Sequence, residues 1–170
     1  MSFQKIQLPA RVVADLFKNS LVMSERKNSE EELSTGQTKY RFLGNYAKKI
    51  TLIISNANNF FLPEDQMLFL TKMLEACKMT FADVAVLNHN SVPINIHNLR
   101  EQLSPRIIIL FGIEPKEIKL PFNSAAFKIQ DYDGCNYLYC PGIDELNQDT
   151  EEGKLLKSKL WVCLRKLFNV

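Results

Sequence analysis

Long hydrophobic runs are missing from this sequence of 170 residues. A membrane-spanning helix needs about 18–20 consecutive, mostly apolar residues, and no stretch approaches that length. The opening residues, MSFQKIQLPARVV, also lack the continuous apolar core of a secretory signal peptide. We therefore expect a cytoplasmic protein that does not bind membranes.

Cysteine and histidine are present without the spacing that metal sites need. The four cysteines form no CxxC pair, and only Cys135 and Cys140 lie near each other, with no histidine beside them. Structural zinc and iron–sulfur sites use closely spaced sets of such ligands. We expect free thiols, and neither a metal nor another cofactor.

A strong excess of one charge is also lacking, since 21 basic residues face 19 acidic ones. Along the chain the balance shifts: residues 50–149 carry seven basic and twelve acidic side chains, whereas the segments on both sides are basic. A surface that follows a phosphate backbone must be positive. The charge distribution therefore predicts no direct contact with nucleic acid.

The length and the composition indicate one folded domain. A domain usually has about 100–200 residues, and 46% hydrophobic with 24% charged residues is the composition of an ordinary globular protein. Two large domains are excluded.

A short N-terminal region is set apart from the rest by its pattern. Apolar residues recur at helical spacing from Leu8 to Met23, and a polar stretch follows to Thr38. We expect an amphipathic helix and a linker over residues 1–38, before an α/β domain over residues 39–170. The helix either packs on its own domain or docks a partner, in which case the docking residues are Leu8, Val12, Leu16 and Phe17.

From residue 50 onward, short apolar runs alternate with helical periods. The predicted strands are Ile50–Ser55, Asp83–Asn88 and Arg106–Gly112, and the predicted helices start near Pro63, Asn95 and Asp149. Around the turn-like sequence DYDG, the flanking residues either pair as a hairpin or leave one final edge strand. The strands are apolar throughout, which is typical of a parallel sheet that is covered on both faces.

This pattern predicts a three-layer α/β fold with a mostly parallel, four-stranded sheet. In such folds ligands bind beyond the carboxyl ends of the strands. The loops expected to form that edge are residues 56–62, 88–93, 112–121 and 141–148.

The order of motifs from Ile50 to Val170, about seven tenths of the chain, resembles the uracil-DNA glycosylase superfamily. The segments IISNANNFF, FLTKMLEACKMTFADVAVLN and SPRIIILFGIEP are similar to its water-activating motif, first helix with second strand, and third strand. The family's final histidine motif, which precedes a helix with a central tryptophan, is matched by the segment from Tyr139 to Gly142 and the helix with Trp161. The resemblance implies a uracil-DNA-glycosylase-like fold.

The catalytic positions of this family differ here. Ser55 replaces the first glycine, Ala57 replaces the residue that positions water, and Asn59 replaces the closing glycine. Cys140 stands where the family has the histidine that stabilises charge on uracil. Since one lost electrostatic group costs about 10²–10³ in rate, we expect no catalytic residues and no glycosylase activity.

One non-catalytic branch of the superfamily is the psi subunit of bacterial DNA polymerase III. The sequence is similar in its N-terminal segment ahead of the domain and in the Ala57-Asn58 pair after the first strand. The resemblance implies a protein-interaction subunit of the replication machinery, with a clamp-loader component or a chi-like protein as its partner.

The alternative is a protein that binds a nucleobase or another small ligand, or a weak glycosylase, using the cleft at the carboxyl ends of the strands. Asparagines there either read a base edge or stabilise turns, and the phenylalanines either stack a base or anchor the loop. The candidate residues of this cleft are Asn56, Asn58, Phe60, Asn88, Cys140 and Pro141.

Overall fold

The computed structural model describes residues 39–56 and 62–170. The predicted N-terminal helix, with its docking residues Leu8, Val12, Leu16 and Phe17, lies outside the described residues. So do the cleft candidates Asn58 and Phe60.

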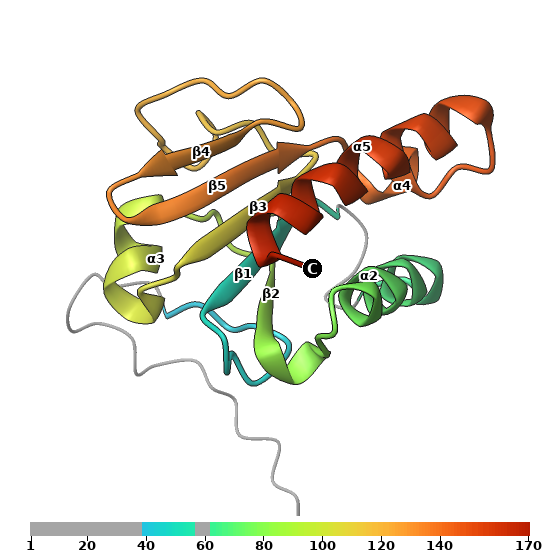
Figure 1. The fold of residues 1–170 in the computed structure, drawn as a ribbon. Helices are drawn as coiled ribbons and strands as arrows, with labels where there is room; N and C mark the ends of the chain where they lie inside the picture. Colours follow the sequence, from blue (N-terminus) through green and yellow to red (C-terminus); the bar gives the residue numbers. More distant parts are fainter. Residues whose placement is uncertain (1–38, 57–61) are drawn as a thin grey trace, which may run out of the picture. The chain divides into compact units, whose positions relative to one another are not determined.

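A five-stranded mixed sheet forms the centre of the described domain (Figure 1). The strand order is β2-β1-β3-β5-β4, in which β4 alone is antiparallel to its neighbour. The strands are β1 (Ile50–Ile54), β2 (Val84–Asn88), β3 (Ile107–Phe111), β4 (Ile129–Tyr132) and β5 (Cys135–Cys140). The predicted α/β class and mostly parallel sheet are confirmed.

The predicted number of four strands is wrong, because the hairpin alternative is the one that forms. Asp133 and Gly134 have φ angles of 53° and 72°, and two consecutive residues at positive φ make the tight turn that suits a two-residue hairpin. Tyr132 therefore pairs with Cys135, and Ile129 with Leu138. This pairing adds β4 as a fifth, partly exposed edge strand.

Helices cover both faces of the sheet. Helices α2 (Glu64–Ala76), α4 (Ile143–Leu146) and α5 (Glu151–Phe168) pack on one face, and α3 (Ile96–Leu103) packs on the other. Successive residues of β1 point to opposite faces, so that Leu52 joins the first core cluster and Ile53 joins the second. Because both faces are buried, the strands are continuous apolar runs.

Local capping signals fixed two of the helix starts. The Asn95 side chain accepts a hydrogen bond from the backbone N–H of His97 at 3.0 Å, and the Thr150 hydroxyl accepts one from Gly153 at 3.1 Å. These are N-cap bonds, and they confirm both predicted starts. Helix α4 is an addition to the prediction, since a single turn is too short to give a periodic signal.

None of the helices within residues 39–56 and 62–170 combines the length and the apolar character that a bilayer crossing requires.

A substitution at Gly153 can test how tightly the start of helix α5 is packed. A Cβ atom at this buried position would lie 2.2 Å from the carbonyl oxygen of Gln148. Alanine usually stabilises a helix interior by about 1 kcal/mol relative to glycine, but overpacking against rigid backbone costs about 1–3 kcal/mol. We expect Gly153→Ala to lower the free energy of unfolding by about 1–2 kcal/mol in urea titrations.

The control is Ser158→Ala, at an exposed position of the same helix, which should raise the free energy of unfolding by a few tenths of a kcal/mol. A Gly153→Ala protein as stable as the control would show that the start of α5 can move away from Gln148.

Candidate functional site

Two asparagines clamp the carboxyl ends of β1 and β2. The backbone N–H of Asn56 donates to Oδ1 of Asn88 at 3.1 Å, and Nδ2 of Asn88 donates to the carbonyl oxygen of Asn56 at 3.0 Å. Oδ1 of Asn88 also accepts a hydrogen bond from the backbone N–H of Asn90 at 3.2 Å. The Asn88 side-chain amide therefore forms hydrogen bonds with the loop backbone, as asparagines in turns commonly do.

A second polar link connects this clamp to helices α2 and α4. Nδ2 of Asn56 donates to Oε1 of Gln66 at 3.5 Å, and Nε2 of Gln66 donates to Oδ1 of Asp144 at 2.7 Å. Gln66 is buried, and its amide bonds on both sides satisfy it there. Sequence reasoning missed Gln66 and Asp144. A signal was available for Gln66, because it lies four residues before Leu70 on the apolar face of α2.

Cys140 ends β5 as a buried side chain. It has 0% exposure and belongs to the core cluster that also contains Cys163 of α5. Burial raises the pKa of the Cys140 thiol far above its ordinary value, and the charge of Cys163 raises it further. The neutral thiol is therefore the form present at physiological pH, and it is a poor nucleophile.

Backbone packs closely where β3 and β5 end. The N–H of Gly112 donates to the carbonyl oxygen of Cys140 at 2.9 Å, and a Cβ atom on Gly112 would lie 3.1 Å from Cα of Gly142. Gly112 has φ +67°, a conformation that favours glycine. Pro141, a cleft candidate, is half-buried beside this contact.

Of the cleft candidates, the structure brings Asn56 and Asn88 into direct contact, and it places Cys140 and Pro141 at the end of β5. His89 follows Asn88 at this edge, where its backbone N–H donates to the carbonyl oxygen of Ile54 at 2.9 Å, whereas His97 lies on α3. Nδ1 of His89 accepts the N–H of Ile94 at 3.1 Å, and the exposed His97 lies 3.5 Å from Glu101.

Chemically, the described part of this edge offers amides, the His89 imidazole and several carboxylates. Asp144 is bonded to the asparagine clamp through Gln66, and Glu114, Glu117 and Glu145 lie near Tyr139. Amide groups can orient a ligand, but they do not transfer protons at neutral pH. Among these groups, Asp144 is the carboxylate linked to the asparagine clamp, which makes it the candidate there for activating water.

A groove lies between α2 and α5, and most of its lining is apolar. Its volume is about 340 Å³, and buried side chains such as Met73 and Leu164 form its floor. Leu68 and Trp161 stand at its sides with 54% and 38% of their surface exposed. Lys72 and Lys157 also line it. Two large apolar side chains therefore face solvent beside an apolar hollow.

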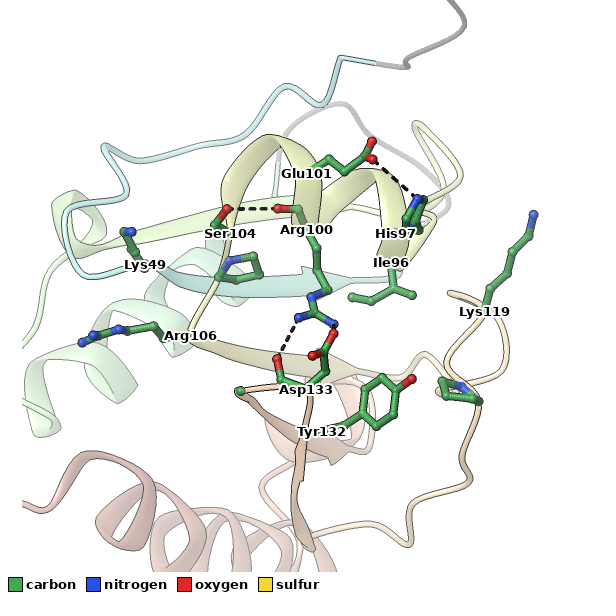
Figure 2. Close-up of a pocket in the computed structure, with 13 residues that line it drawn as sticks. Lys49, Ile96, His97, Arg100, Glu101, Ser104, Arg106, Lys119, Tyr132 and Asp133 are labelled. Atoms are coloured by element: carbon green, nitrogen blue, oxygen red, sulfur yellow. Dashed lines mark hydrogen bonds and ion pairs between the residues drawn. The ribbon is translucent and has the colours of Figure 1, made fainter.

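A larger cavity, of about 740 Å³, lies at the amino ends of the strands (Figure 2). Lys49 and Arg106, which line it, directly precede β1 and β3. Arg100 of α3 points into it and binds the β4–β5 turn, through an ion pair with the Asp133 carboxylate and a hydrogen bond of 2.7 Å to the Asp133 carbonyl oxygen. Sequence reasoning placed no site at this edge.

No group of three or more histidine, cysteine, aspartate or glutamate side chains within residues 39–56 and 62–170 is arranged to hold a metal ion. Comparison of the sequence with known protein families and with curated proteins gives no match.

The thiols provide a test of whether this edge carries a nucleophile. Burial raises the pKa of all four cysteines, and that of Cys135 to about 11. Because alkylation requires the thiolate, we expect the folded protein to react with iodoacetamide at pH 8 at least 100-fold more slowly than the protein in urea. Mass spectrometry of tryptic peptides measures each site separately. Rapid labelling of Cys140 in the folded protein would contradict the inert thiol.

Proposed function

We propose that this protein is a non-catalytic interaction subunit of the bacterial replication machinery, with a uracil-DNA-glycosylase-like fold and a role similar to that of the polymerase III psi subunit. The observation that carries an interaction role is the apolar groove between α2 and α5. Its partner is a clamp-loader component or a chi-like protein.

The groove has the properties of a protein-binding surface. Tryptophan is enriched among the residues that dominate binding energy at interfaces, and Trp161 is 38% exposed beside a hollow that is already formed. Leu68 faces it from α2 with more than half of its surface in solvent. The groove floor belongs to the main core. A partner would therefore meet a rigid surface and lose little free energy in ordering it.

The fold and the carboxyl edge agree with this proposal. The motif FLTKMLEA lies on α2, and the runs DVAVLN and RIIILFG contain β2 and β3, which is the order that the resemblance implies. At the position of the family's histidine, Cys140 is buried and neutral. Asn88 is engaged with backbone. These features support a domain that kept a glycosylase-like framework without its chemistry.

Leu68 and Leu155 offer a matched pair of variants for testing the groove. Both lie on helices with 54% and 55% exposure, but only Leu68 lines the groove. We expect Leu68→Glu to reduce co-purification of clamp-loader components with the tagged full chain by at least tenfold, because a charge would be buried at the interface. Leu155→Glu should leave it unchanged.

Quantitative mass spectrometry of the purified complexes provides the readout. The proposal fails if clamp-loader components are absent from the wild-type sample. It also fails as a statement about this groove if both variants lose the partner equally.

The second candidate function, a weak glycosylase or nucleobase-binding protein, is favoured by one observation. The Asp144 carboxylate reaches the Asn56–Asn88 clamp through Gln66. In an enzyme, a carboxylate at this place could orient the attacking water.

A base-release assay separates the two candidates. Under the interaction proposal, the wild-type chain and Asp144→Asn should release no uracil or hypoxanthine above background from single- or double-stranded DNA. Release by the wild-type chain that Asp144→Asn abolishes would establish the enzyme instead.

A further inference from the structure

We propose that the cavity at the amino ends of the strands binds an organic phosphate that carries a planar ring, a ligand of nucleotide type. This site lies at the edge of the sheet opposite the cleft considered above. It is independent of the interaction role proposed for the α2–α5 groove.

The first argument is that the backbone places two cationic residues next to each other. The backbone N–H of Arg106 donates to the carbonyl oxygen of Lys49 at 2.9 Å, so these residues are held side by side where β1 and β3 begin. Both side chains are exposed, and the described structure gives neither an acidic partner. Lys48, by contrast, pairs with Asp83 at 3.6 Å. Neighbouring like charges repel each other, and a bound anion would relieve that repulsion.

A third cation lies on the other side of the cavity. Figure 2 shows Lys49 and Arg106 towards one end, the Arg100–Asp133 pair in the middle, and Lys119 beyond it. No acidic partner for Lys119 is present within the described residues. Two carboxylates also line the cavity, and each faces a basic side chain, Asp133 with Arg100 and Glu101 with His97. The three other cations lie around the rim, and the Arg106 and Lys119 side chains extend outwards at opposite ends.

The backbone at two of these lysines is unusual. Lys49 and Lys119 have φ angles of 57° and 64°, in the left-handed region that costs a side-chain-bearing residue free energy and favours glycine or asparagine. Six other non-glycine residues of the described structure share this conformation, so it does not by itself mark a site, but it makes asparagine the suitable replacement at both lysines. Here the chain carries a cation at both strained positions.

The cavity also offers a platform for a ring. Tyr132 is 41% exposed, and its ring lies 5.4 Å from that of Phe122, centroid to centroid, in a tilted pair that holds its orientation. Figure 2 shows it on the Lys119 side of the Arg100–Asp133 pair. Exposed aromatic rings beside cations bind the bases of nucleotides by stacking while the cations bind the phosphate.

The size of the cavity suits one nucleotide unit. The cavity volume of about 740 Å³ lies within the usual range of small-ligand sites, about 300–1,000 Å³.

The test uses the full chain, isothermal titration calorimetry at low salt, and ADP as the probe. Pyrophosphate and adenosine serve as the phosphate-only and ring-only ligands. We expect ADP to bind at least fivefold more tightly than either. Tyr132→Leu should weaken ADP binding at least threefold and leave pyrophosphate binding unchanged.

Lysine variants at left-handed positions provide a matched control. Lys49→Asn and Lys119→Asn should each weaken ADP binding threefold to tenfold. Lys78→Asn removes the same charge from an exposed residue with φ 56° that does not line the cavity, and it should have no effect. Because asparagine tolerates this backbone, all three variants should remain folded, which urea titration verifies.

Displacement of ADP by a short oligothymidylate would support the same site and identify single-stranded nucleic acid as the source of the nucleotide. The proposal is overturned if ADP fails to bind at 10 mM, if pyrophosphate binds as tightly as ADP, or if Lys78→Asn weakens binding as much as the cavity variants. Displacement of ADP by an oligoglutamate peptide at lower concentration than by the oligonucleotide would also overturn it.

Discussion

Burial of the sheet on both faces is the constraint on which the rest of this domain depends. Strand β1 lies between β2 and β3, and its five residues are all buried. Side chains at the middle of such a strand are fully committed to packing and cannot bind a ligand. Polar chemistry is therefore confined to the two edges of the sheet and to the outer surfaces of the helices.

These locations are used differently. At the carboxyl edge, asparagine and glutamine side chains bind the loops and helices to each other, and Cys140 is part of the core. At the amino edge, three cations lack acidic partners within the described residues. On the outer surface, α2 and α5 leave Leu68 and Trp161 in solvent. These three cations and the two exposed apolar side chains thus lie away from the edge where ligands usually bind in α/β folds.

Much of the fold could be predicted because its signals are local. The apolar run at β1, the Asn95 cap and the Thr150 cap each depend on a few neighbouring residues. The fifth strand was only one of two alternatives, because its partly exposed edge position gives it a weaker apolar pattern. The candidate site was harder to predict than the fold. Asn56 and Asn88 were predicted, but the role of Asp144 depends on its hydrogen bond to Gln66, which lies 78 residues away in the chain.

The sequence by itself determined the α/β class and the mostly parallel sheet, since these follow from the period and the apolar character of the side chains. Only the tertiary structure decided where the charges gather. Counting charge along the chain assigns Lys49 to a basic segment and Arg106 and Lys119 to an acidic one. The pairing of β1 with β3 brings Lys49 beside Arg106, and the cavity joins them to Lys119. Electrostatic interactions depend on distance in space, so a sum over sequence could not reveal this cluster.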